Sequence, residues 1–324
     1  MICQFIDRYK VKYGVVPICN ALEAKGITIA PRTYWAYCKR MPSSRELWDI
    51  AITEILRSIY DPDAKVKKPA ESLYGSKKMW AYLNRQNIPV ARCTIERLMK
   101  ANGYRGVTRA GKVKTTVSDP NATRPPDLVK RNFIPNMPNE LLVVDFTYVS
   151  LQARFAYVAF VIDAYANLIV GWECSTTKDT DFVERALRQA MFLRAHQGFQ
   201  FNGNTIHHSD AGSQYRAVHY SETLMLNGLV ASIGSVGDAY DNALAETVIG
   251  LYKTECIRID SPFRSGPILT LADLEDLTSR WVGWYNNERL MHRIGLIPPR
   301  QAEAAYYSSL CYTESDDNSV IDTR

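Results

Sequence analysis

Three apolar runs between residues 141 and 175 constrain the fold of this chain more than any other feature. LLVVDFTYVSL, FAYVAFVIDAY and NLIVGWECS are rich in β-branched and aromatic residues and are separated by polar breaks, which is the pattern of three sequential strands. Helical segments then alternate with two short strand-like segments, NTIHHSD and GLVASIGS. The helices are expected at Asp181–His196, Val218–Asn227 and Asp241–Cys256. This order predicts an α/β fold, a mixed sheet flanked by helices.

The first 105 residues have helical rather than strand-like spacing. The expected helices are Val16–Lys25, Pro31–Arg40, Glu46–Tyr60, Ser76–Asn87 and Arg92–Asn102. The pair that ends at Arg40 and the pair that ends at Asn102 are each typical of a helix-turn-helix, although a structural helical bundle has the same pattern. In the second pair, Lys77 and Lys78 are expected on the outer face, and Arg92 and Arg97 on a groove-facing helix.

Charge divides the chain into a basic front and an acidic rear. Residues 1–140 hold 25 Lys and Arg against 12 Asp and Glu, a net charge of +13, whereas the rest holds 14 against 22, a net charge of −8. A basic front indicates a module that binds a polyanion such as DNA. Lys112 and Lys114 lie in a basic, turn-rich stretch that is expected either to follow a phosphate backbone or to serve as a flexible connector.

These patterns predict five segments. They are an N-terminal helical segment and helix-turn-helix candidate (1–44), a helix-turn-helix DNA-binding domain (45–105), a basic linker (106–138), an α/β catalytic core (139–262) and a C-terminal helical extension with a tail (263–324). No apolar run approaches the length of a membrane-spanning helix, and the N-terminus lacks a secretory layout. The seven cysteines are scattered, which predicts reduced thiols in the cytoplasm and no structural zinc site.

Three carboxylates in the rear half are the candidate catalytic residues. Asp145 interrupts an apolar strand, Asp210 follows a strand, and Glu246 lies on a helical face with Asn242 and Lys253. A buried carboxylate needs a cation or a path to the surface. Oxygen ligands of this kind suit Mg²⁺, and two such ions promote phosphoryl transfer. Each acid alone also has an ordinary structural explanation.

The sequence motifs around the three acids, taken together, decide between these interpretations. VVDFTYV, HHSDAGSQY and GDAYDNALAETVIGLYKTE, with 35 residues between Asp210 and Glu246, resemble the DDE transposases of the insertion sequence 3 family. WVGWYNNERLMHRIGLIPP is similar to that family's C-terminal segment, and YGSKKMWAYL followed by ARCTIERLMKANGYRG to its helix-turn-helix. Leu142 stands where a tryptophan is common, and AYAN replaces an aromatic-Ser-Arg run. Neither departure touches a carboxylate.

The resemblance implies an RNase H-like core that cleaves DNA at insertion-sequence ends and transfers the 3′-hydroxyl strand, so that DNA is integrated. It implies Asp145, Asp210 and Glu246 as ligands of two Mg²⁺ ions, with Mn²⁺ as a substitute. The implied partners are the terminal inverted repeats, target DNA, further copies of the chain in a synaptic complex, and a helix-turn-helix product of an upstream frame, separate or fused. The implied location is the prokaryotic nucleoid.

Other interpretations predict different residues. A retroviral-type integrase needs two N-terminal histidines, but no histidine precedes His196. A catalytically inactive DNA-binding regulator would not need all three acids. Adjacent strand residues face opposite ways, so His207 is expected in the core and His208 near Asp210. The expected DNA contacts are Lys253, Asn242, His208, Lys77, Lys78, Arg92, Arg97, Lys112 and Lys114.

Overall fold

The structure is a computed structural model that describes residues 2–108, 128–129, 133–152, 154–201, 203–210, 218–233 and 242–318, the last eight of these by their backbone alone. Its contacts divide the chain into two compact units, Met1–Ser58 and Ile59–Arg324. Each unit is described by itself below. In the described residues, no helix is long and apolar enough to cross a membrane.

The N-terminal unit is helical. Its elements are α1 (Ile2–Tyr13), α2 (Val15–Glu23), α3 (Pro31–Lys39) and most of α4 (Ser44–Tyr60). The first three helices enclose a small core of Ile6, Val15, Ile18, Cys19 and Tyr34. The Tyr34 hydroxyl donates a hydrogen bond to the Asp7 carboxylate at 2.7 Å. The helices α2, α3 and α4 confirm the sequence prediction, whereas α1 had not been predicted.

The second unit begins with a helical part that contains a 3₁₀ turn (Ala70–Leu73), α5 (Ser76–Arg85) and α6 (Arg92–Ala101). Trp80 closes the α5–α6 turn by donating its indole N–H to the Val90 carbonyl at 3.0 Å. The Tyr74 hydroxyl contacts the end of α10, accepting a hydrogen bond from the Leu290 amide at 3.1 Å. This contact joins the helical part to the α/β part within one unit.

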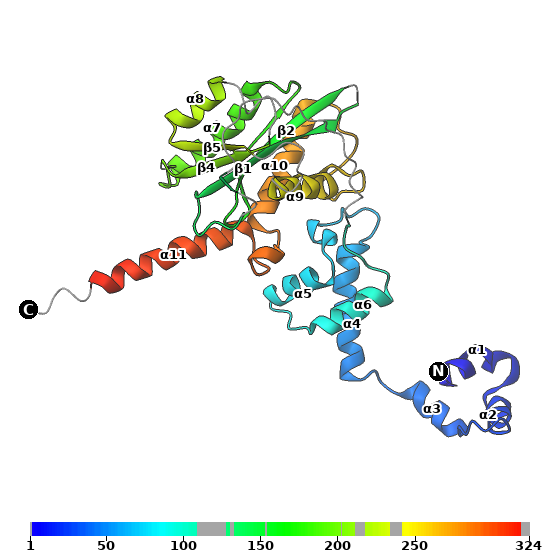
Figure 1. Cartoon of the computed structure of the whole chain (residues 1–324). Helices are drawn as coiled ribbons and strands as arrows, with labels where there is room; N and C mark the ends of the chain where they lie inside the picture. Colours follow the sequence, from blue (N-terminus) through cyan, green and yellow to red (C-terminus); the bar gives the residue numbers. More distant parts are fainter. Residues whose placement is uncertain are drawn as a thin grey trace, which may run out of the picture. The chain divides into compact units, whose positions relative to one another are not determined.

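A five-stranded mixed sheet forms the centre of the second unit (Figure 1). Its strands are β1 (Leu141–Ser150), β2 (Phe155–Asp163), β3 (Leu168–Ser175), β4 (Thr205–Ser209) and β5 (Leu229–Ile233). Their order is β3-β2-β1-β4-β5, with β1, β2 and β3 antiparallel and β4 and β5 parallel to β1. The expected mixed α/β sheet is therefore confirmed.

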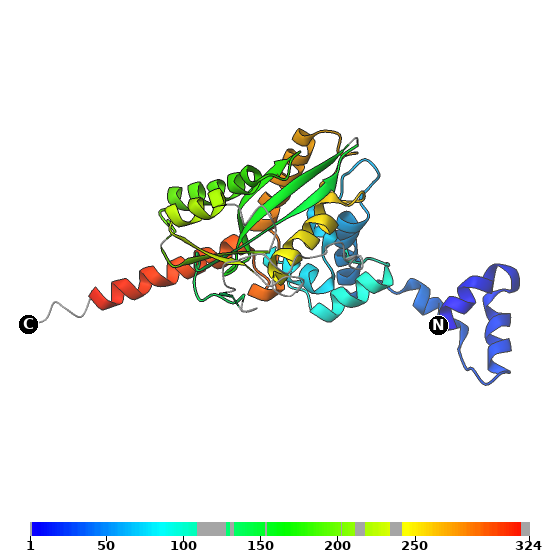
Figure 2. The same ribbon diagram turned by 45° about the horizontal axis from the view of Figure 1, so that its top comes forward.

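Helices cover both faces of the sheet (Figures 1 and 2). On one face, α7 (Thr180–His196) and α8 (Val218–Leu226) pack on a core that includes Leu142, Val144 and Val161. On the other face lie α9 (Ala243–Tyr252), the π-helical turn Lys253–Ile257 and α10 (Leu271–Asn287). Phe160 of β2 contacts Tyr252 and Trp281 there, with ring centroids 5.0 and 6.1 Å apart.

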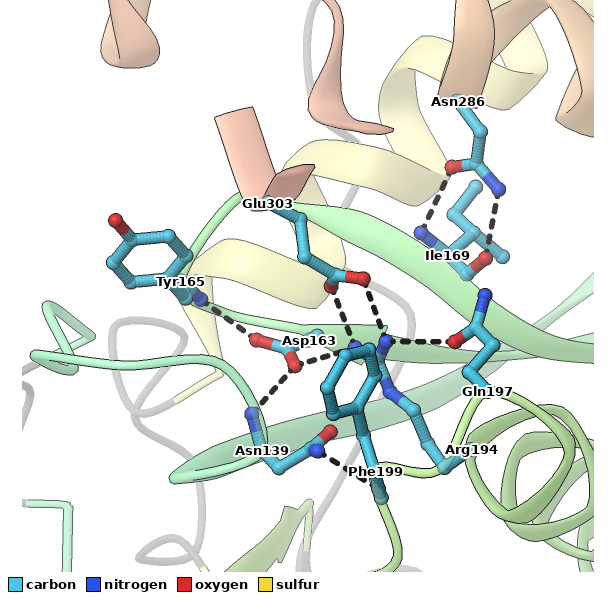
Figure 3. Close-up of polar contacts among 9 residues, drawn as sticks. All are labelled: Asn139, Asp163, Tyr165, Ile169, Arg194, Gln197, Phe199, Asn286 and Glu303. Carbon is cyan, nitrogen blue, oxygen red and sulfur yellow. Dashed lines mark hydrogen bonds and ion pairs between the residues drawn. The ribbon is translucent and has the colours of Figure 1, made fainter. Parts of the chain in front are cut away.

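A buried ion-pair network ties the C-terminal helix α11 (Pro299–Asn318) to the sheet (Figure 3). Arg194 of α7 donates to the Asp163 carboxylate at 2.8 Å and to both oxygens of Glu303 at 2.7 and 2.8 Å. Arg194 and Asp163 are fully buried, and the side chain of Glu303 is 6% exposed. Nearby, the Asn286 amide pairs with both backbone groups of Ile169 on the edge strand β3.

Candidate active site

Asp145 lies near the middle of β1, on the face of the sheet covered by α9 and α10. The strand register pairs it with Phe160, which packs on that face. Its side chain is half-buried, and its Oδ1 accepts a hydrogen bond from the Phe146 amide at 2.8 Å. The buried apolar residues on either side of Asp145 hold this part of β1 in the sheet.

Asp210 follows directly on β4, the parallel neighbour of β1. The register pairs Val143 with His208 and Val144 with Ser209. Asp145 and Asp210 are the residues that follow the last of these pairs on β1 and β4. Neighbouring strands lie about 4.8 Å apart and side chains alternate between faces. Asp210 is exposed. Two carboxylates from adjacent parallel strands thus lie side by side where the β1–β4 pairing ends.

Glu246 is placed by the start of α9. Asn242 caps this helix and donates its side-chain N–H to the Val144 carbonyl of β1 at 3.2 Å. The Glu246 amide bonds to the Asn242 carbonyl at 3.1 Å, so Glu246 lies one turn further along. Leu244 and Val248 are buried on the other side of the helix, while Leu251 on that side is half-buried. Among the described residues, the Asn242 side-chain oxygen is buried without a hydrogen-bond partner.

Lys253 lies at the end of α9, where the chain enters the π-helical turn. Its ammonium group lies 4.8 Å from the centroid of the Tyr148 ring, which projects from β1 three residues beyond Asp145. Burial lowers the pKa of Lys253, while the nearby Asp145 carboxylate acts in the opposite direction. A lysine therefore stands at the edge of the acidic cluster.

The pKa of Asp145 responds to its charged neighbours. Burial raises the pKa of Asp145 well above its ordinary value, and the charges of Asp210 and Glu246 raise it further, while Lys253 lowers it. In the part of the chain that the structure describes, no group of three or more His, Cys, Asp and Glu side chains is arranged to hold a metal ion. Burial and the two neighbouring charges together favour the protonated form of Asp145.

Replacement of Asp145 by Asn is expected to stabilise the metal-free protein. Because the folded-state pKa is raised, the stability contribution of Asp145 is present at low pH and is lost as pH rises through the folded pKa. We therefore expect Asp145→Asn to raise the unfolding free energy at pH 7. Denaturant unfolding in EDTA at pH 7 and pH 4 measures this; a variant less stable than wild type at pH 7 contradicts it.

Three segments of the chain match known protein families. Residues 135–239 match the family "Integrase core domain", and residues 227–299 match a second family of the same description. Residues 51–112 match the family "HTH-like domain". The two integrase-core matches together contain β1, Asp145, Asp210 and Glu246, and the third contains α5 and α6.

Whole-length relatives decide the family. The putative transposase for insertion sequence element IS986/IS6110 of Mycobacterium tuberculosis is 47% identical over 280 residues, which is 86% of this chain and 96% of the relative. The transposase for IS629 of Shigella sonnei is 42% identical over 311 residues, 94% of this chain and 96% of the relative. This chain belongs to the insertion sequence 3 family of transposases. Its function is DNA transposition, and its enzyme class is that of the DDE polynucleotidyl transferases.

Among solved structures, the transposase is similar to the HTLV-2 integrase catalytic core domain in complex with magnesium. That dimeric form is 15% identical, with a TM-score of 0.40, and the match covers 52% of this chain and 98% of the integrase chain. The intasome of simian T-cell lymphotropic virus gives 14% identity and a TM-score of 0.42, with 69% of this chain and 70% of the other covered.

The expected DNA contacts of the transposase lie in different surroundings. Lys77 is exposed on α5, and Arg92 and Arg97 are exposed on α6, where Arg92 pairs with Glu96 at 2.8 Å. Lys78 was predicted on the outer face, but it is half-buried with its ammonium 5.4 Å from the centroid of the Tyr74 ring. Burial and the Arg289 charge lower its pKa to about 7, so Lys78 is a poorer phosphate contact than Lys77.

The two histidines of β4 are both buried, which corrects one prediction. His207 bonds to the Tyr220 hydroxyl at 2.8 Å, in the core as expected. His208 was predicted to contact DNA near Asp210, but it is fully buried and its Nδ1 bonds to Ser232 of β5 at 2.9 Å. The face of the sheet on which His208 lies was predicted correctly, but the His208 side chain is buried there by its packing against β5. The predicted contacts Lys112 and Lys114 lie outside the described residues.

Proposed function

We propose that Asp145, Asp210 and Glu246 are the catalytic acids with which this transposase cleaves DNA at insertion-sequence ends and joins the 3′-hydroxyl to a new phosphate. The observation that carries the proposal is the placement of the acids: Asp145 and Asp210 lie on the neighbouring strands β1 and β4, and Asn242 ties the start of α9, and with it Glu246, to β1. Since like charges at one point cost free energy, such an arrangement is retained where a cation or a phosphate is handled. A regulator without catalysis has no use for it.

The donor set suits Mg²⁺, with Mn²⁺ as a substitute, better than a softer ion. Its oxygens come from three carboxylates, and the Asn242 side chain adds a buried oxygen that has no hydrogen-bond partner in the part of the chain that the structure describes. Hard divalent ions prefer such oxygen ligands. When bound, one or two such ions would activate the attacking oxygen and stabilise the leaving oxygen at the scissile phosphate. The three acids would hold the ions, and strand β1 would position Asp145 among them.

Lys253 supplies the positive charge at the edge of the site. We infer that it contacts a phosphate next to the cut, since it is exposed and lies over Tyr148 close to Asp145. Lys253→Ala should reduce strand joining by about 10- to 150-fold, because a charged hydrogen bond to phosphate contributes ~1.5–3 kcal/mol. Joining assays with pre-nicked end duplexes measure it, with Lys178→Ala as an exposed control. If Lys253→Ala joins strands at the wild-type rate, the proposed phosphate contact of Lys253 is wrong.

The helical part Ser76–Ala101 is proposed to bind the terminal inverted repeats, with α6 as the groove-facing helix. Arg92 and Arg97 are exposed on α6. The double variant Arg92→Ala/Arg97→Ala should weaken end binding and lower the slope of log K against log salt by about 2. Binding titrations at several salt concentrations measure both. A slope unchanged from wild type contradicts the assignment.

The remaining partners follow from the chemistry. Joining an element's two ends to target DNA requires the ends to be held together, so we propose a synaptic complex that contains more than one copy of the chain. An upstream-frame helix-turn-helix product, separate or fused, is a further proposed partner. Its substrate places the enzyme with the prokaryotic nucleoid.

A further inference from the structure

A stretch of the N-terminal unit has the same residue spacing as the α5–α6 helix-turn-helix. Shifted by 61 positions, residues 14–39 align without a gap with residues 75–100, and six of the 26 positions are identical. The identical pairs are Gly14 and Gly75, Leu22 and Leu83, Ile27 and Ile88, Ala30 and Ala91, Thr33 and Thr94, and Lys39 and Lys100. We name these stretches the first repeat (14–39) and the second repeat (75–100).

The turns of the two repeats close with matching hydrogen bonds. In each repeat the turn contains a residue with a left-handed backbone, Gly26 with φ 82° and Asn87 with φ 60°. The next amide reaches back over five residues, from Ile27 to the Leu22 carbonyl at 2.9 Å and from Ile88 to the Leu83 carbonyl at 3.0 Å. This is the Schellman way of ending a helix, so the first helix of each repeat ends in the same manner.

The second helix of each repeat also begins in the same manner. Ala30 has φ −75° and ψ 142°, and Ala91 has φ −72° and ψ 143°. The amides of Thr33 and Thr94 bond to these alanine carbonyls at 2.9 and 3.0 Å. Equal helix ends, turn length and helix starts make α2–α3 and α5–α6 the same supersecondary unit.

Side chains that orient the helices occupy equivalent positions. Ile18 and Met79 are buried on the first helices, and Tyr34 and Ile95 are fully buried on the second helices. The first repeat has its own core with α1, in which Ile6 of α1 packs with Cys19 of α2. The two repeats differ in that Tyr37 is 45% exposed where its counterpart Leu98 is 6% exposed, so α3 has more free surface than α6.

We propose that the first repeat is a second DNA-reading helix-turn-helix, which binds duplex DNA with α3 in the major groove. Between Arg32 and Lys39 every α3 residue except Tyr34 is exposed, and an α-helix fits the major groove of B-DNA. The first repeat has three basic residues against one acidic residue, and the second has six against one. The family matches begin at residue 51 and leave the first repeat unassigned. The inference rests on the proposed DNA binding by the second repeat.

The test compares three double variants of the full chain on an end-containing duplex. Arg32→Ala/Lys39→Ala changes α3, Arg92→Ala/Arg97→Ala changes α6, and Arg8→Ala/Lys12→Ala removes equal charge from α1 as the control. We expect the α3 variant to bind at least about 10-fold more weakly, with a salt slope lower by about 2, and the control to stay within about threefold. Footprinting should show the α3 and α6 variants each losing a different protected segment, and circular dichroism checks that each variant is folded.

The outcomes separate this inference from the proposed function. Loss of binding in the α6 variant with wild-type binding and footprint in the α3 variant overturns the inference alone. An equal loss in the α3 and α1 variants assigns the effect to net charge and also overturns it. A wild-type footprint with altered oligomeric state in the α3 variant identifies α3 as a contact between copies of the chain, which contradicts DNA reading. No effect from the α6 variant contradicts the proposed role of the second repeat instead.

Discussion

Asp210→Asn is expected to abolish Mg²⁺-dependent cleavage of an end-containing duplex, with a loss of at least about 1000-fold, while DNA binding stays nearly unchanged. Asp210 follows β4 next to Asp145 on β1, and it is exposed. An amide has nearly the same shape but lacks the charge that holds a divalent ion. Because Asp210 is at the surface, the substitution should leave the fold intact.

The measurement is single-turnover cleavage of a labelled duplex, with end binding followed in parallel. Asp276→Asn is a matched control, because Asp276 is an exposed carboxylate of α10 paired with Arg280 at 2.8 Å. The control should cleave at the wild-type rate. Cleavage by Asp210→Asn at that rate would remove Asp210 from the catalytic set.

Arg194→Met should be the most destabilising single substitution in the α/β part. The guanidinium is fully buried between Asp163 and Glu303 (Figure 3). Its removal leaves two buried carboxylates without a cation, and breaking a buried ion pair in this way costs about 3–5 kcal/mol. For a unit of this size, the melting temperature should fall by roughly 10 °C. The start of α11 should loosen first, since Glu303 attaches it.

Thermal unfolding and hydrogen exchange of α11 test this expectation. Arg185→Ala serves as the control on the same helix, because its ion pair with Glu173 is partly exposed and such pairs contribute about 1 kcal/mol or less. A melting temperature of Arg194→Met within 2–3 °C of the control, about 1 kcal/mol, would contradict the role given to the network.

Asp145 and Asp163 show where sequence reasoning stops. Both interrupt apolar strand-like runs, LLVVDFTYV and FAYVAFVIDAY, and nothing in either run distinguishes them. Asp163 meets Arg194, which is 31 residues away in the chain, whereas Asp145 meets two further acids. The sheet and helices follow from local periodicity, but the partner of a buried charge depends on tertiary contacts. The resemblance of the motif around Asp145 to a known family, rather than its periodicity, identified Asp145 as a candidate catalytic residue.

His208 illustrates the same limit, whereas α1 does not. Alternation along β4 predicted the face of His208 correctly, but burial on that face is set by Ser232 of β5 and by Phe133, 5.9 Å away between ring centroids. The α1 segment has apolar residues at helical spacing, among them Ile2, Ile6 and Tyr9, so periodicity could have predicted this helix. Ile6 of that stripe packs in the three-helix core.

Metal-specific rescue tests the central claim that the three carboxylates are metal ligands. Asp145→Cys, Asp210→Cys and Glu246→Cys replace a hard oxygen by a softer thiolate, which Mg²⁺ disfavours and Mn²⁺ accepts better. Cleavage of an end-containing duplex is measured for each variant in Mg²⁺ and in Mn²⁺. We predict inactivity in Mg²⁺ and a partial return of activity in Mn²⁺. The account is contradicted if the variants cleave at the wild-type rate in Mg²⁺, or if none of the three variants regains cleavage activity in Mn²⁺.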